Sequence, residues 1–231
     1  MGKDVIIPLD FEDAEKMFAF LDLLGELKPY VKVGMELFYA EGPPVVRELK
    51  KRGYKVFLDL KLHDIPNTVM GAMRSLRRLG IDMVNVHAST VAMMEAALEG
   101  LTHEDGTRPI IIGVTQLTST SEQEMRSELL IERSMEEVVA RYARNAKKAG
   151  LDGVVCSPLE TKIVKETCGS DFLTVTPGIR FADARADDQA RVTTPESAKE
   201  AGSDYIVVGR PITRADDPAA AYKMCVGAFV G

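Results

Sequence analysis

At residues 57–68 the chain reads Phe57-Leu58-Asp59-Leu60-Lys61-Leu62-His63-Asp64-Ile65-Pro66-Asn67-Thr68, which sets charges along an otherwise apolar strand. Side chains two apart on a strand share a face, so Asp59 and Lys61 are expected to project together while leucines cover the other face. A buried carboxylate or ammonium is costly unless it is paired. The alternating Asp-Leu-Lys pattern at the end of a strand therefore predicts a preorganised reaction centre.

Short runs of β-branched and apolar residues recur on both sides of this strand. With the strand itself, the runs are residues 5–7, 31–33, 56–58, 83–86, 110–112, 153–155, 173–175 and 205–208. Segments between them, such as 18–24, 45–49, 69–79 and 138–149, carry apolar residues at helical spacing. Repeated strand–helix units imply parallel strands, and eight of them favour a (β/α)8 (TIM) barrel over an open sheet.

Glycines and charged residues support this assignment of strands and helices. Gly53, Gly80 and Gly150 each stand just before a predicted strand, as expected where a helix closes with a left-handed residue. Polar residues then fall at or just past the strand ends, where barrels carry their chemistry. These residues are Asp10, Lys32, Asp59, Lys61, His87, Thr118, Arg180 and Arg210.

Size and composition set further bounds. No linker or low-complexity tract divides the 231 residues, which predicts one domain over residues 1–231. A net charge of −6 without a long basic cluster argues against nucleic-acid binding. The chain has no apolar run of membrane-spanning length and no secretory signal pattern, so we expect a soluble, cytoplasmic protein without a membrane partner. Cys156, Cys168 and Cys225 lack metal-ligand spacing and are expected to be buried thiols.

Four separated motifs carry a resemblance to a known family. Asp59, Lys61, Asp64 and Ile65 form Asp-x-Lys-x-x-Asp-Ile, followed by Pro-Asn-Thr. The other motifs are Gly-Val-Thr-Gln-Leu-Thr-Ser at 113–119, Thr-Pro-Gly-Ile-Arg at 176–180 and Val-Gly-Arg-Pro-Ile at 208–212. From residue 10 to residue 210 the chain resembles the orotidine 5′-phosphate decarboxylase family. The resemblance implies a carboxy-lyase that converts orotidine 5′-monophosphate to uridine 5′-monophosphate and carbon dioxide, the last step of UMP biosynthesis, with neither metal nor organic cofactor.

The same resemblance assigns roles at the reaction centre. Lys61 would stabilise negative charge at C6 of the pyrimidine and then protonate that carbon, combining electrostatic and general-acid catalysis. Asp59 would hold Lys61 charged and aimed. Lys32 would complete the alternating charged array and touch the ribose, and Asp10 would receive ribose hydroxyls. In the family the equivalents of Asp64 and Ile65 reach into the neighbouring subunit's site, which implies a homodimer with shared active sites.

Other substrate contacts also follow from the resemblance. Thr68 lies on the same contributed segment as Asp64 and Ile65. Arg180, Arg210 and the Gly209 amide would bind phosphate at the loops after the last two strands, and Pro177 would line the substrate site. Thr118 would hydrogen-bond the pyrimidine. Gln189 would bridge phosphate and pyrimidine when a lid at 181–190 closes.

Simpler interpretations stand beside these. Asp59 and Lys61 could be a buried ion pair that sets barrel register, and Asp64 could cap the helix that begins near Pro66. The two arginines could be surface ion-pair partners, Gly209 a turn residue and Thr118 a helix cap.

Rival functions are also open. Barrel relatives that act on sugar phosphates share the Asp-x-Lys-x-x-Asp motif and use magnesium, but Lys32 stands where they carry an acidic metal ligand. A non-catalytic nucleotide-binding protein and a phosphoribosyl isomerase are further alternatives.

Overall fold

The computed structural model describes residues 2–181 and 193–231. Eight parallel strands hydrogen-bond in chain order and close into a barrel, with the last strand paired to the first. They are β1 (Asp4–Pro8), β2 (Tyr30–Gly34), β3 (Lys55–Leu62), β4 (Met83–His87), β5 (Ile110–Val114), β6 (Gly153–Val155), β7 (Leu173–Thr176) and β8 (Tyr205–Val207). The prediction of a (β/α)8 barrel is confirmed.

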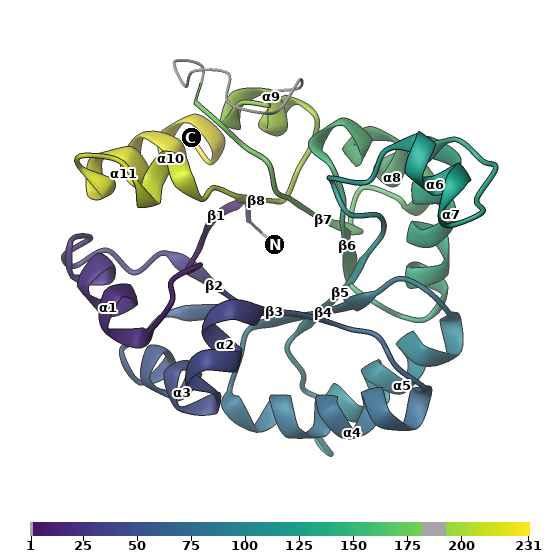
Figure 1. The fold of residues 1–231 in the computed structure, drawn as a ribbon, viewed down its shortest axis with the longest axis horizontal. Helices are drawn as coiled ribbons and strands as arrows, with labels where there is room; N and C mark the ends of the chain where they lie inside the picture. The colour runs from purple at the N-terminus through teal and green to yellow at the C-terminus, as the bar shows by residue number, and fades with distance from the viewer. Residues whose placement is uncertain (1, 182–192) are drawn as a thin grey trace.

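Helices follow the strands and surround the barrel, as Figure 1 shows along its axis. They are α1 (Ala14–Asp22), α2 (Met35–Glu41), α3 (Pro43–Lys51), α4 (Pro66–Leu76), η1 (Arg77–Leu79), α5 (Val91–Leu101), α6 (Glu122–Ser127), α7 (Met135–Lys148), η2 (Pro158–Glu160), α8 (Thr161–Cys168), α9 (Pro195–Glu200), α10 (Arg210–Thr213) and α11 (Pro218–Phe229). None of these described helices is both long and apolar enough to cross a membrane.

Local sequence explains where these helices start and stop. Helix α7 opens with a capping box in which the Ser134 hydroxyl accepts from the Glu137 amide and the Glu137 carboxylate accepts from the Ser134 amide. It closes before Gly150, whose φ of 85° is the left-handed conformation that glycine adopts without strain. Gly53 and Gly80 have φ of 85° and 67° at the equivalent places, which confirms the predicted helix ends.

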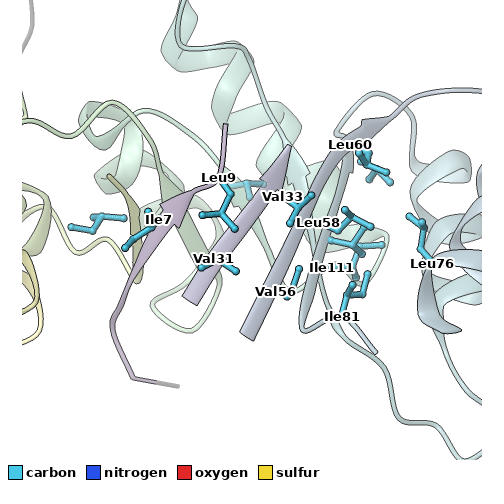
Figure 2. Close-up of a cluster of buried hydrophobic side chains, with 14 of the residues drawn as sticks. Ile7, Leu9, Val31, Val33, Val56, Leu58, Leu60, Leu76, Ile81 and Ile111 are labelled. Carbon is cyan, nitrogen blue, oxygen red and sulfur yellow. The ribbon is translucent and has the colours of Figure 1, made fainter. Parts of the chain in front are cut away.

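The two faces of the strands form two apolar layers. One face packs outward against the helices, and Figure 2 shows part of this layer with Ile7, Val31, Val56 and Leu58 on neighbouring strands. The other face fills the lower barrel interior. The interior cluster consists of Ile6, Tyr30, Phe57, Met83, Ile112, Leu173, Val175, Tyr205 and Val207. The barrel is therefore plugged below, and ligands can approach the strand ends from one side only.

Side-chain alternation then fixes what lies above this plug. Lys32 stands two residues beyond Tyr30, and Asp59 two residues beyond Phe57. Since residues two apart share a face, both charged side chains lie in the interior directly above the apolar layer. The predicted buried thiols are confirmed, because all three cysteines are free and buried.

Candidate active site

A cavity of about 400 Å³ opens at the carboxyl ends of the strands, above the apolar plug. Residues from every strand or the loop after it contribute to its wall. Of the predicted site residues, Asp10, Lys32, Asp59, Lys61, Thr118, Pro177, Arg180, Gly209 and Arg210 line this cavity. Asp64, Ile65 and Thr68 are not among its lining residues and are exposed. Gln189 lies outside the described residues.

Four charged groups alternate in sign across one wall of the cavity. Lys61 Nζ lies 2.6 Å from Asp59 Oδ1, and Lys32 Nζ lies 3.2 Å from Asp59 Oδ2. Lys32 Nζ also lies 3.3 Å from Asp10 Oδ1. The Asp59 side chain is 10% exposed and sits between both cations, whereas the Asp10 side chain is 58% exposed at the rim. The spacing makes one compensated array rather than separate ion pairs.

Electrostatics keep Asp59 ionised in this array. Burial alone would raise the pKa of the Asp59 carboxyl, because it disfavours the charged form. The charges of Lys32 and Lys61, with hydrogen bonds from Lys61 and Asn85, outweigh burial and lower the pKa below its ordinary value. Asp59 is thus a fixed negative charge, available to orient an ammonium and to repel another anion.

The backbone that carries Asp59 and Lys61 is not the regular strand expected from the sequence. Strand β3 pairs with β4 through Leu58–Val84 and next through Leu62–Val86, so Asp59, Leu60 and Lys61 lie opposite one residue of β4. Lys61 itself has a φ of 50°, a backbone conformation that residues other than glycine rarely adopt. Asp59 and Lys61 nevertheless both line the cavity, while Leu58, Leu60 and Leu62 pack in the outer layer, as the predicted alternation requires. The bulge changes the pairing of β3 with β4, not the face on which these side chains lie.

Asn85 is a site residue that the sequence analysis missed. It is the β4 residue opposite the bulge, is 1% exposed and lines the cavity. Its Oδ1 accepts the Lys61 backbone N–H at 2.8 Å, and its Nδ2 donates to Asp59 Oδ1 at 2.7 Å. An amide between two valines of a buried strand was the available signal, because buried polar groups are retained where they find partners.

Gly34, at the end of β2, leaves room for the rim of the charged array. A Cβ at this position would lie 3.1 Å from Asp10 Oδ1 and 3.2 Å from Lys32 Nζ. Both distances are tighter than ordinary contacts, so any side chain here would press on the Asp10–Lys32 pair. The absence of a side chain at Gly34 therefore lets Asp10 and Lys32 keep their contact.

Two arginines line the cavity on the β7–β8 side. Within residues 2–181 and 193–231, neither Arg180 nor Arg210 has a carboxylate within 4.0 Å, so the surface ion-pair alternative gains no support there. Burial, and then the neighbouring charge of Arg210, lower the pKa of Arg180. Two like charges that face one cavity favour an anion between them. Gly209 packs close to β1, since a Cβ there would lie 3.1 Å from Pro8 Cγ.

The structure decides two of the helix-cap alternatives. The N-cap residue of α4 is Ile65, without a side-chain cap hydrogen bond, and Asp64 instead accepts from the Ile65 amide at 2.6 Å. The N-cap residue of α6 is Ser121, so Thr118 does not cap this helix. Neither Asp64 nor Thr118 therefore caps these helices.

His87 ends β4 beside the site without lining the cavity. Its ring centroid lies 5.5 Å from that of His63, and burial, followed by the charges of His63 and Lys61, lowers its pKa. A neutral His87 adds no positive charge next to Lys61. Across the described part of the chain, no group of three or more His, Cys, Asp or Glu side chains is arranged to hold a metal ion.

Comparisons with known proteins identify the family of this chain. The family model described as "Orotidine 5'-phosphate decarboxylase / HUMPS family" matches residues 3–225. An orotidine 5'-phosphate decarboxylase from Bacillus cytotoxicus is 56% identical over 227 residues, covering 96% of this chain and 95% of that protein. A Bacillus mycoides protein of the same name matches equally.

Solved structures give the same answer. The crystal structure of orotidine 5'-phosphate decarboxylase from Lactobacillus acidophilus has a TM-score of 0.89 and 45% identity, covering 99% of this chain and 100% of that chain. A conserved protein from Geobacillus kaustophilus has a TM-score of 0.86 and 49% identity, with coverage of 97% and 99%. The chain belongs to the orotidine 5′-phosphate decarboxylase / HUMPS family.

Proposed function

We propose that this chain is a carboxy-lyase that converts orotidine 5′-monophosphate to uridine 5′-monophosphate and carbon dioxide, the last step of UMP biosynthesis. The observation that carries the proposal is the Lys61 ammonium, 2.6 Å from buried Asp59 in a cavity that also holds two arginines. Family membership and relatives named for this reaction support the choice of substrate.

The chemistry requires a cation beside C6 of the pyrimidine. Loss of carbon dioxide leaves an electron pair on C6 that the ring cannot delocalise as an enolate would. Lys61 stabilises this developing charge and then donates the proton that completes the product. Asp59, itself paired with Lys32, holds the Lys61 ammonium in place before substrate arrives, so little reorganisation is needed during the reaction.

Asp59 also repels the carboxylate of the bound substrate. At ~4 Å and an effective dielectric near 20 the repulsion is about 4 kcal/mol. That amounts to about a thousandfold in rate. Uncatalysed decarboxylation of this kind is very slow, so the enzyme must supply a large rate enhancement. Ground-state repulsion accounts for the smaller part of that enhancement. Stabilisation of the carbanion and binding energy from the rest of the nucleotide supply the larger part.

The remaining cavity residues fit the two polar ends of a nucleotide. Arg180, Arg210 and the Gly209 amide bind the phosphate in this proposal, at the loops where barrels commonly bind phosphate. Asp10 and Lys32 bind ribose hydroxyls. Thr118 and Pro177 contact the substrate from the remaining walls of the cavity. The contact of Gln189 with phosphate and pyrimidine remains a prediction.

We also propose that the working unit is a homodimer with shared sites. Asp64, Ile65 and Thr68 carry the family motif yet are exposed and do not line their own chain's cavity. Ile65 is 66% exposed, and a contact across a subunit interface would remove its apolar surface from water, which is favourable. In the dimer these residues complete the neighbouring site, with Asp64 joining the charged array. The cytoplasmic location stays a prediction from sequence.

The decisive experiment follows the absorbance of orotidine 5′-monophosphate with purified protein in the presence of a metal chelator. We expect absorbance to fall at an undiminished rate with chelator, and Lys61→Ala to abolish turnover while nucleotide binding stays measurable. Near-normal turnover by Lys61→Ala would refute the assignment. Dependence on magnesium, with no reaction of this nucleotide, would favour a sugar-phosphate enzyme on the same barrel.

A further inference from the structure

We propose that Asn85 is a positioning residue that holds the β3 bulge in the one geometry that aims Lys61 and Asp59 at the reacting carbon. The inference rests on the proposed decarboxylation and extends it to a residue outside the family motif. Asn85 acts through Lys61 and Asp59, and no chemical step is assigned to it.

The bulge creates a need for a side-chain partner. Three residues of β3 lie opposite Asn85, so the ladder of backbone hydrogen bonds between β3 and β4 is interrupted there. Without Asn85, the Lys61 N–H would have no strand partner at a partly buried position, which is costly. Asn85 Oδ1 accepts this N–H at 2.8 Å and replaces the missing backbone carbonyl.

The other end of the same amide fixes the carboxylate. Asn85 Nδ2 donates to Asp59 Oδ1 at 2.7 Å, and this oxygen also accepts from Lys61 Nζ at 2.6 Å. The Lys61 N–H can only donate and an ionised carboxylate can only accept, so one orientation of the amide satisfies both. One side chain thereby connects the backbone of the proposed proton donor to its counter-ion.

Lys61 needs this support because its backbone is strained. With φ at 50°, the residue occupies a region that persists only where surrounding structure enforces it. Strand pairing cannot enforce it, since the neighbouring pairs are Leu58–Val84 and Leu62–Val86 on either side. Asn85, 1% exposed and hydrogen-bonded at both ends, is the group placed to do so.

The first test is Asn85→Ala, assayed with orotidine 5′-monophosphate and by equilibrium binding of uridine 5′-monophosphate. We expect kcat to fall about 100-fold, the size of effect that follows a misplacement of about 1 Å at a reacting group. Binding of the product should change less than about threefold, because the arginines and Asp10 are untouched. A kcat within threefold of wild type would overturn the inference. Failure of the wild-type protein itself to decarboxylate would instead overturn the proposed function.

Thr161→Val is the matched control for lost stability. Thr161 is fully buried, and its hydroxyl lies 3.3 Å from Ser203 Oγ, away from the cavity lining. The variant therefore also removes a buried hydrogen bond. We expect both variants to lower Tm and only Asn85→Ala to lower kcat. Equal loss of kcat in both variants would mean that Asn85 has a structural role alone.

The pH dependence of kcat in Asn85→Asp distinguishes a role of Asn85 in positioning Lys61 and Asp59 from a role in packing alone. The new carboxyl would have the size of the amide but would face Asp59, with Lys61 and Lys32 as the nearby cations and His87 further along β4. Two carboxylates at hydrogen-bond distance favour sharing one proton, and the protonated form restores one donor and one acceptor. We expect the ratio of variant to wild-type kcat to rise as pH falls from 8 to 5. A ratio that is flat across this range contradicts the proposal.

Discussion

Arg108 and Asp152 form a bidentate ion pair at the end of the barrel opposite the cavity, with Nη1–Oδ2 at 2.5 Å and Nη2–Oδ1 at 2.8 Å. Asp152 Oδ2 also accepts the Ile111 N–H at 2.8 Å, and the Asp152 N–H donates to the Ile111 carbonyl at 2.9 Å. The residue that precedes β6 therefore fastens the start of β5 while it neutralises a cation.

Among the residues that the structure describes, the same arrangement occurs three times around the barrel. In each case an aspartate just before an even-numbered strand accepts from the amide of a residue in the preceding strand and pairs with a basic side chain. The three sets are Asp82 with Val56 and Lys50, Asp152 with Ile111 and Arg108, and Asp204 with Thr174 and Lys165. These sets lie at the strand starts, opposite the cavity, so they concern stability rather than chemistry.

We expect Asp152→Ala to lower the free energy of unfolding by about 1–3 kcal/mol, because it removes charged hydrogen bonds to Arg108 and leaves the Ile111 N–H without its side-chain acceptor. Asp152→Asn keeps an acceptor oxygen and should lose less. Urea unfolding measures both values, and kcat should stay unchanged. A large fall in kcat for a fully folded Asp152→Ala would show that the two ends of the barrel are coupled.

Arg210→Ala tests the phosphate side of the cavity. A charged hydrogen bond contributes about 1.5–3 kcal/mol, so we expect kcat/KM to fall about 10- to 100-fold and product binding to weaken to a similar degree. Steady-state kinetics and titration with uridine 5′-monophosphate measure the two effects. The matched control is Arg214→Ala, which removes a nearby arginine that is absent from the cavity lining and should leave both values unchanged. Unaltered product binding in Arg210→Ala would remove this arginine from the phosphate site.

The lowered pKa of His87 predicts a specific pH dependence of stability. Burial first, and then the charges of His63 and Lys61, disfavour protonation in the folded state, whereas the unfolded chain takes up a proton near pH 6.5. Stability from neutral His87 is therefore present above that pH and is lost as pH falls through the folded-state pKa. Between pH 7.5 and 5.5, Tm should fall more for wild type than for His87→Gln. Parallel Tm curves would contradict the assigned burial effect.

Much of this fold was predictable because its signals are local. The β-branched runs and the glycines at 53, 80 and 150 report strand burial and helix ends from their own chemistry, without any tertiary information. The charged cavity residues were predictable for a related reason. Parallel strands bring their carboxyl ends to one mouth, so polar residues at those ends meet wherever the barrel closes.

The bulge in β3 was not predictable, because it arises between two strands. Nothing in Asp59-Leu60-Lys61 alone says that three residues will lie opposite one, or that Lys61 will adopt a positive φ. The partner that satisfies the bulge, Asn85, is 24 residues from Lys61 in sequence. Non-local hydrogen bonds of this kind leave only a weak trace, here one amide in a buried strand.

Mixing two inactive variants tests whether sites are shared between subunits. Lys61→Ala and Asp64→Ala proteins should each be inactive alone. In a mixed dimer with shared sites, one site loses both groups and the other keeps both, because Lys61 and Asp64 of one site come from different chains. Since about half of randomly mixed dimers are heterodimers, activity should recover to roughly a quarter of wild type.

Lys61→Ala mixed with Asp59→Ala supplies the control for this experiment. Lys61 and Asp59 lie 2.6 Å apart in one chain's cavity, so each site of a mixed dimer lacks one of them and no activity should return. Recovery in the first mixture alone identifies Asp64 as the group that crosses the interface. Absence of recovery in both, with subunit exchange verified by tagged chains, would mean self-contained sites and would require exposed Asp64 to fold back over its own cavity.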